Sequence, residues 1–485
     1  MKRIKFRYIF AAYAVVLSCV CMFLIYPAHD DFYYASPKPG INILRGIMPT
    51  KTHWRPFDRL IEYGLGYAPF LFPWVNHILV LSSHLILCAS LYVILRKITR
   101  RRLYSAIGTL FFCLSPGIIY TVTNTDTVNQ SWAALMGVAS AFSYFKARDE
   151  NRERLYSCWL GFAFISALFK ENGIAWFLAP VLLYMVYEYA KNGMALSVSL
   201  KKNSAFILTG ILGTLAYFCI RFMLMGKIAL GDSSGRYAVS FSPKLFINII
   251  KHYCQIIGGS ISSIDTLAFF LKPRNYAVLA FTGIVSTVFL CFVIAMVYGI
   301  FRNERKTFNI IAGLFTCALY ISSPYTVMAH VSEATAYEMA FMFALIFGIV
   351  LSSSRMSRAF VISCALMFLC MISVCCHKIY ILHEWSSEIR SFLCEHKADF
   401  RNTPSKIFIY FIEDIPEEGY SVYWYTPGHS FASGQAFLSL WEWKPKFRVK
   451  NVSSDADIKF TPESLPEYDT VFSLTQSGIL KVLRN

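Results

Sequence analysis

The chain has 485 residues, of which 56% are hydrophobic and only 15% are charged. This composition is too apolar for a soluble protein of this length, and apolar runs of about 18 residues or more recur along most of it, as membrane-spanning helices require. The formal net charge of +17 would suggest nucleic-acid binding in a soluble protein. Because the Lys and Arg residues gather in alternate loops, the charge instead reports membrane topology, and nucleic acid is not expected as a partner.

The apolar runs and the basic loops between them predict eleven transmembrane helices. Clusters such as MKRIKFR and RKITRRR fall on the side that the positive-inside rule assigns to the cytoplasm. The N-terminus is therefore predicted to be cytoplasmic and, with an odd number of helices, the C-terminus to be outside. The closely spaced fifth and sixth runs also allow a single re-entrant pair, which would move the C-terminus to the cytoplasm. The predicted helices cover residues 8–28, 71–95, 103–123, 130–145, 155–169, 173–190, 203–224, 275–300, 307–325, 335–353 and 359–377.

The pattern divides the chain into two parts. Residues 1–377 are predicted to form the transmembrane domain, with large outer loops at 29–70 and 225–274. From about residue 405 the chain changes to short alternating runs such as KIFIYFI, DTVFSL and ILKVL, which are typical of strands. Residues 378–485 are therefore predicted to form a small extracytoplasmic α/β domain, and the fold class is an all-α polytopic membrane protein with this domain attached.

Two adjacent carboxylates, Asp30 and Asp31, directly follow the first apolar run in the stretch FLIYPAHDDFYYASPKPG. One interpretation is that either of them caps a short helix by accepting its free N–H groups. The other is that one Asp is a general base for an acceptor hydroxyl, while the second orients that hydroxyl or helps to hold a metal or a sugar. Repulsion between neighbouring carboxylates would raise the pKa of one of them and suit it to proton transfer.

Further charged residues lie at or near the outer ends of the predicted helices. Charges at membrane depth usually face a protein interior or a wet cavity, so we expect one extracytoplasmic site that holds both carboxylates and cations. Lys170 and Glu171 form either an ion pair at a turn or a site in which Lys170 faces a phosphate. Arg55 either reaches to lipid headgroups or belongs to the site. The full set is Asp30, Asp31, Arg55, Asp126, Lys170, Glu171, Arg221, Arg236, His330 and Glu333.

Two histidines, His77 and His84, stand seven residues apart on one face of the second predicted helix. This is not the spacing of four residues that is typical of a helical metal pair, so packing or hydrogen bonding is favoured over direct chemistry. The sequence contains no metal-type C-x-x-C spacing, and we predict no metal ligands from the residue pattern.

Six motifs resemble, in their order, those of the C-type (GT-C) membrane glycosyltransferases, especially the protein O-mannosyltransferase branch and its bacterial relatives of unassigned substrate. The motifs span about residues 25 to 350. They are HDDF, WRPFDRLIEYGLG, NHILVLSSHLILC, FFCLSPGIIYTVTNTDTVNQSWAAL, ALFKENGIAWFLAP and SEATAYEMAFMFALIFG. The resemblance implies a GT-C-like fold and a hexosyltransferase that takes a sugar from a polyprenyl-phosphate donor and moves it to an acceptor hydroxyl on the outer face of the membrane.

The same resemblance implies roles for individual residues. Asp30 and Asp31 would lie at the catalytic centre, and Arg55, Lys170 and Glu171 near the lipid phosphate. His77 and His84 match paired histidines of the family, although Val80 replaces an Asn between them. Glu333 and Tyr337 match a late Glu-Arg-x-x-Tyr pattern in which Ala334 replaces the arginine. Asp126, Arg236 and His330 complete the predicted donor- and substrate-binding set.

Several alternatives remain open at the level of sequence. A transporter or flippase for lipid-linked glycans would also need many helices and a basic outer cavity, although the sequence shows no related halves. A polysaccharide polymerase or ligase also joins lipid-linked sugars outside the membrane, but the early Asp pair favours the transferase. The acceptor is a glycan, a lipid or a protein. The sequence points to no particular cofactor, and His29 beside the two Asp residues is compatible with either a metal-independent reaction or one assisted by a divalent metal. We expect a multi-pass protein surrounded by lipid, in a bacterial cytoplasmic membrane.

Overall fold

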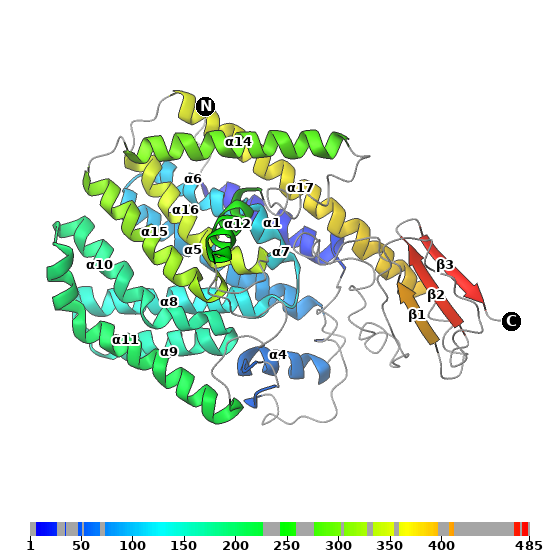
Figure 1. Cartoon of the computed structure of the whole chain (residues 1–485), viewed down its shortest axis with the longest axis horizontal. Coiled ribbons are helices and arrows are strands. Elements are labelled where there is room, and N and C mark those ends of the chain that lie inside the picture. The colour runs from blue at the N-terminus through cyan, green and yellow to red at the C-terminus, as the bar shows by residue number, and fades with distance from the viewer. Residues whose placement is uncertain are drawn as a thin grey trace.

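The chain is mostly helical in a computed structural model (Figure 1). The model describes residues 6–26, 34, 47–50, 53–67, 73–226, 243–258, 276–301, 305–326, 333–353, 358–395, 407–411, 470–475 and 478–483.

Every one of the eleven predicted transmembrane ranges overlaps a helix. The first range overlaps α1 (Phe6–Cys19) and the π-helical turn η1 (Val20–Leu24). The second to seventh ranges overlap α5 (Trp74–Thr99), α6 (Arg102–Cys113), α7 (Pro116–Thr123), α8 (Val128–Glu150), α9 (Arg154–Phe169), the 3-10 helix η3 (Glu171–Phe177), α10 (Ala179–Asn192) and α11 (Leu196–Met225). The last four overlap α14 (Tyr276–Phe301), α15 (Arg305–Thr326), the 3-10 helix η5 (Glu333–Ala336) with α16 (Tyr337–Ser353), and α17 (Arg358–Glu395).

Five helices in the described part of the chain are long and apolar enough to cross a membrane, and two bent pairs raise this number to as many as seven. The bend between α6 and α7 is 61°, and the bend between η3 and α10 is 42°. Both follow from prolines near the start of the second helix, since Pro116 and Pro180 cannot donate to a preceding turn. The chain is therefore a polytopic membrane protein, while the count of eleven spans remains a prediction.

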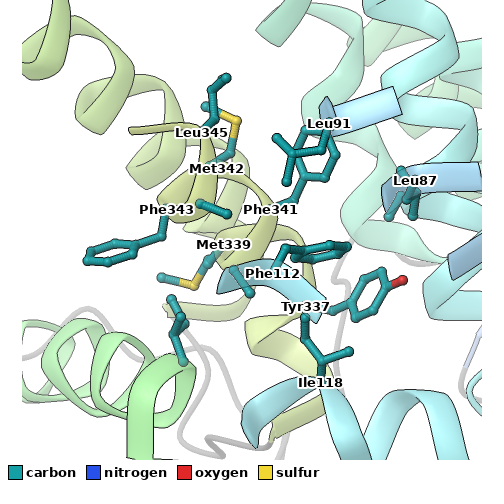
Figure 2. Packing of buried hydrophobic residues seen from close by; sticks show 14 of the residues in the cluster. Leu87, Leu91, Phe112, Ile118, Tyr337, Met339, Phe341, Met342, Phe343 and Leu345 are labelled. Carbon is teal, nitrogen blue, oxygen red and sulfur yellow. The ribbon is translucent and has the colours of Figure 1, made fainter. Parts of the chain in front are cut away.

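Helix α16 lies at the centre of the packed helices. All of its residues from Tyr337 to Leu351 are buried, and it packs against α5, α6 and α15. Figure 2 shows Phe112 of α6 between Tyr337 and Phe341, with ring centroids 5.6 Å from each. A helix that is apolar on all sides must be covered on all sides, by protein or by lipid.

Two further helices belong to the predicted outer loops. Helix α4 (Pro56–Tyr67) packs on α8 and α9, and α12 (Lys244–Gly258) packs on α7, η5 and α16. His252 Nε2 lies 2.6 Å from Thr335 Oγ1, so α12 is joined directly to η5. Both outer helices thus lie against the ends of the transmembrane bundle, where the predicted site residues are.

The C-terminal region contains three strands, β1 (Ile407–Phe411), β2 (Thr470–Thr475) and β3 (Gly478–Leu483). They form one sheet in which β1 and β2 are parallel and β2 and β3 are antiparallel. The strands coincide with three of the alternating runs in the sequence. Helix α17 continues through the predicted boundary at residue 377 as far as Glu395. The α/β domain as a whole remains a prediction, because most of residues 396–469 lie outside the described part.

Candidate functional site

The carboxylate of Glu171 lies between two arginines from distant parts of the chain. Arg55, just before α4, donates from Nε to Glu171 Oε2 at 2.7 Å. Arg221 of α11 lies with Nη1 3.6 Å from Glu171 Oε1, and its side chain is fully buried. Burial disfavours the positive charge on Arg55, but the negative charges of Glu171 and, to a smaller extent, Asp58 outweigh burial and raise the pKa of Arg55 above its usual value. Glu171 is therefore paired with arginines, and the simple Lys170–Glu171 ion pair considered from the sequence does not form.

Lys170 is the third cation of this group. It occupies the extended break between α9 and η3, where its backbone angles are φ −153° and ψ 140°. In the part of the chain that the structure describes, its ammonium group has no hydrogen bond and no ion pair within 4 Å. Burial, followed by the nearby charge of Arg55, lowers the pKa of Lys170 to about 8, while Asp126, Glu171 and Asp58 act in the opposite direction. Lys170 is thus a half-buried cation that can still accept an anionic partner.

A second carboxylate, Asp58 of α4, lies in the same neighbourhood. The Tyr34 hydroxyl donates to Asp58 Oδ1, and Asn129 Nδ2 donates to Asp58 Oδ2 at 3.1 Å and to the backbone oxygen of Asp126 at 3.0 Å. Burial raises the pKa of Asp58, although the hydrogen bond from Tyr34 and the charge of Arg55 oppose this change. Asp58 therefore connects the first outer loop to the beginning of α8.

A third carboxylate, Glu338, lies on the otherwise apolar α16. It accepts hydrogen bonds from Asn172 Nδ2 at 2.5 Å and from Trp176 Nε1 at 3.4 Å, both on η3. The nearby Tyr325 hydroxyl donates to Gln130 Oε1 at 2.8 Å. The two bonds to Glu338 fix η3, and with it Glu171, against α16, and the bond from Tyr325 joins α15 to the start of α8.

The two histidines lie in a separate group. His84 Nδ1 is 2.8 Å from the Tyr337 hydroxyl, and His84 Nε2 is 2.8 Å from the Tyr13 hydroxyl. This agrees with the hydrogen-bonding interpretation of His84 and joins α1, α5 and α16. His77 is buried, and its Nδ1 has no hydrogen-bond partner among the described residues.

The structure thus brings together five of the predicted residues, Arg55, Asp126, Lys170, Glu171 and Arg221, while their role as one functional site remains a prediction. Asp30, Asp31, Arg236 and His330 lie outside the described residues, and Glu333 is the first residue of η5. The sequence interpretation missed Asp58, Tyr34 and Glu338. For Glu338 a signal existed, since a carboxylate within an apolar helix is itself a functional indication.

The described residues contain no group of three or more His, Cys, Asp or Glu side chains that could hold a metal ion. His29, Asp30 and Asp31 are not among the described residues. The idea of a divalent metal beside the Asp pair therefore stays a prediction.

Comparisons with known proteins give structural neighbours only. No family model matches the chain, and no curated protein matches it. An oligosaccharyltransferase from Archaeoglobus fulgidus in the apo form has 11% sequence identity and a TM-score of 0.42, with 94% of this chain and 65% of that chain covered. Its complex with Zn and sulfate has 12% identity and a TM-score of 0.43, covering 96% and 67%.

A third structure is the Archaeoglobus fulgidus oligosaccharyltransferase with an inhibitory peptide and a dolichol-phosphate, at 12% identity and a TM-score of 0.43, covering 96% of this chain and 69% of that chain. The chain thus spans about two thirds of the length of these proteins. All three neighbours are oligosaccharyltransferases, and they do not show the protein O-mannosyltransferase branch. That branch of the resemblance therefore remains a prediction.

Proposed function

We propose that the protein is an integral membrane glycosyltransferase that moves a hexose from a polyprenyl-phosphate donor to an acceptor hydroxyl on the outer face of the membrane. One observation supports this most directly. Arg55, Lys170 and Arg221 come from three separate segments of a membrane protein and meet around Glu171 at helix ends that the charge pattern assigns to the outside.

The cations suit the leaving group of this reaction. A polyprenyl phosphate stays in the bilayer, so its sugar must react at the membrane surface. When the bond between the anomeric carbon and the phosphate oxygen breaks, its electron pair goes to that oxygen, and a positioned cation stabilises the developing charge. Lys170 is assigned the phosphate because its ammonium group is not engaged by a described carboxylate. Arg55, oriented by Glu171, adds positive charge beside it.

The acceptor needs a base. As the acceptor oxygen forms its bond to the anomeric carbon, its proton must leave, and Asp30 or Asp31 is assigned to take it. Asp126, Arg236, His330, Glu333 and Tyr337 are assigned to binding of the donor and the acceptor. His77 and His84 are assigned to support of the site, since His84 reaches Tyr337.

The proposal includes a location. The N-terminus is cytoplasmic, the site and the C-terminal domain are on the outer side, and the membrane is a bacterial cytoplasmic membrane. The acceptor is a glycan, a lipid or a protein that reaches this surface.

The test measures release of polyprenyl phosphate from a polyprenyl-phosphate hexose by purified protein in lipid nanodiscs, with a cell-envelope extract as the source of acceptors. Wild type is compared with Asp30→Asn, Asp31→Asn and Lys170→Met. The matched controls are Asp149→Asn near the end of α8 and Lys201→Met on the exposed start of α11. We expect acceptor-dependent release that falls about a hundredfold in one Asp variant and in Lys170→Met, and that stays unchanged in both controls.

A different result would refute the transferase. If wild type releases no polyprenyl phosphate from any carrier, while reconstituted vesicles move a lipid-linked glycan across the bilayer, the protein is a transporter. If the donor is consumed only when the acceptor is itself a lipid-linked glycan, the protein is a polymerase or ligase.

A further inference from the structure

Three buried amide side chains lie beside the cations of the site, and each is bonded to the protein through one end. Asn129 Nδ2, in the first turn of α8, donates to Asp58 Oδ2 at 3.1 Å. Asn172 Nδ2, on η3, donates to Glu338 Oε2 at 2.5 Å. Gln130 Oε1, next to Asn129, accepts a hydrogen bond at 2.8 Å from a tyrosine hydroxyl of α15. These bonds fix the orientation of each amide group.

The opposite ends of the same amides are Asn129 Oδ1, Gln130 Nε2 and Asn172 Oδ1, which we call the three amide atoms. None of them has a hydrogen-bond partner among the residues that the structure describes. The three residues are only 7%, 0% and 2% exposed, respectively. A buried polar atom without a hydrogen bond destabilises a protein, and such atoms are normally satisfied by protein, by water or by a ligand. The three amide atoms therefore indicate that a polar molecule completes their hydrogen bonds.

The groups that hold the amides place them around Lys170. Asp58 and Glu338, which hold two of them, are both close enough to Lys170 for their charges to interact with its ammonium group. The hydroxyl that holds Gln130 belongs to Tyr325, which interacts electrostatically with Glu338. The amides therefore surround the cation to which the donor phosphate is assigned. In a polyprenyl-phosphate hexose, the group attached to that phosphate is the sugar.

The chemistry of the three amide atoms matches a sugar better than the other parts of the donor. The oxygens of Asn129 and Asn172 need a hydrogen-bond donor, whereas the Gln130 nitrogen needs an acceptor. A phosphodiester only accepts hydrogen bonds, and a polyprenyl chain neither donates nor accepts them. A hydroxyl group does both, and a hexose carries several of them in a fixed arrangement.

Resting on the proposed function, we propose that Asn129, Gln130 and Asn172 form a sugar subsite that binds hydroxyl groups of the transferred hexose while Lys170 binds its phosphate. The bonds at the far ends of the amides hold the three amide atoms in place before the donor arrives. A site of this kind rejects a sugar that lacks the matching hydroxyl, because its own polar atoms would then stay unpaired. The three residues therefore determine which hexose is transferred.

The first test is kinetic and varies the sugar and the side chain together. The nanodisc assay is run with polyprenyl-phosphate mannose, glucose and galactose, and then with the 2-, 3-, 4- and 6-deoxy forms of the best of them. In wild type, kcat/KM should fall about tenfold or more for at least one deoxy donor. In Gln130→Met or Asn172→Leu, removal of the hydroxyl bound by that residue should change kcat/KM less than about twofold, because the hydrogen bond is already lost.

Two further variants separate sugar binding from a general loss of structure. Gln130→Glu keeps an acceptor for Tyr325 and replaces only the Nε2 donor, so it should reproduce the lost discrimination and decides the matter if Gln130→Met aggregates. Asn203→Leu is the matched control, because this buried amide of α11 is bonded to protein side chains at both ends. Its ratio of kcat/KM between deoxy and parent donors should equal that of wild type, even if the variant is less stable.

The second test measures binding without turnover. Isothermal titration of the protein in nanodiscs compares polyprenyl phosphate with the polyprenyl-phosphate hexose. Wild type should bind the glycosylated lipid about tenfold or more tightly than polyprenyl phosphate. Gln130→Met and Asn172→Leu should lose most of this preference, while their affinity for polyprenyl phosphate changes less than about twofold.

The outcomes separate this inference from the proposed function. If the losses from variant and deoxy donor multiply for every hydroxyl, water rather than sugar completes these hydrogen bonds, and the inference is overturned while an active wild type keeps the proposed function. If wild type releases no polyprenyl phosphate, the proposed function fails and the binding measurement decides the inference. A preference for the glycosylated lipid that the variants lose would support the sugar subsite, and equal affinities in wild type would overturn it.

Discussion

Glu171 is the residue around which the cations of the site are arranged. A buried carboxylate needs compensation, and here two guanidinium groups supply it, from Arg55 at 2.7 Å and from Arg221 at 3.6 Å. Two arginines and one carboxylate leave a net charge of +1 on this unit. The adjacent Lys170 adds another positive charge without a described ion-pair partner. An anionic ligand can therefore bind beside Lys170 without displacing Glu171 from Arg55.

The pKa of Lys170 predicts an alkaline limit for the transfer reaction. Burial and the charge of Arg55 lower this pKa to about 8, so the ammonium form is present below this pH and is lost above it. Because only the ammonium form attracts phosphate, kcat/KM for the donor should fall as pH rises through about 8. Bound phosphate favours the charged form, so the fall in kcat at saturating donor should occur at higher pH.

The control for this prediction is Lys170→Arg, since a guanidinium stays charged over the whole range. In this variant kcat/KM for the donor should not decline near pH 8, even if the maximal rate is lower than in wild type. Steady-state rates between pH 6 and 10 provide the measurement, and an identical decline in Lys170→Arg would show that another group sets the limit.

At the scale of elements, the approach of α6 to α16 depends on a pair of glycines. A Cβ at Gly108 would lie 2.7 Å from Leu95 Cδ1 and 3.1 Å from the Gly348 Cα. Small residues of this kind allow helix backbones to approach closely in membranes. We therefore expect Gly108→Ala to separate the two helices and to destabilise the protein by about 1 to 3 kcal/mol.

Gly161 of α9 offers the matched control, because nothing lies within 4 Å of a Cβ built there. Gly161→Ala should be neutral or should stabilise the protein by about 0.5 to 1 kcal/mol through its better helix propensity. Thermal unfolding of the two variants in detergent compares them directly. Equal midpoints would contradict the close packing of α6 on α16.

The helices were predictable because their cause is local. Each apolar run of sufficient length forms a helix, as a bilayer requires, and each predicted range overlaps one in the structure. The bends were not predicted, because the apolar character of the sequence continues across Ser115 and Leu178, although Pro116 and Pro180 mark the bends in the sequence. The extension of α17 to Glu395 also escaped the apolar pattern, since its last turns contain charged residues.

The site was predictable only in part, for a related reason. Arg55, Lys170 and Glu171 were found because charges at the ends of apolar runs are conspicuous. Arg221 was in the predicted set too, but its pairing with Glu171 was not predicted, because the two residues are fifty positions apart and only packing brings them together. Asp58 resembles an ordinary surface residue of an amphipathic helix until its burial and its contact with Tyr34 are known.

At the scale of the whole molecule, the orientation of the C-terminal region depends on how many times the chain crosses the membrane. Five to seven described helices qualify as spans by length and composition, whereas eleven ranges were predicted. The predicted count is odd, and with a cytoplasmic N-terminus it places residues 378–485 outside, on the same side as Arg55 and Lys170.

Fusions of alkaline phosphatase and of a cytoplasmic fluorescent protein to residue 395 show on which side of the membrane this residue lies, because the phosphatase is active only outside. We expect an active phosphatase and a dark fluorescent protein at residue 395, and the opposite pair at residue 152 in the basic segment between α8 and α9. Fluorescence at both positions would mean an even number of crossings. The contacts of His383 with the Leu24 backbone oxygen and of Ser386 with the Tyr26 N–H could then not lie on the outer side.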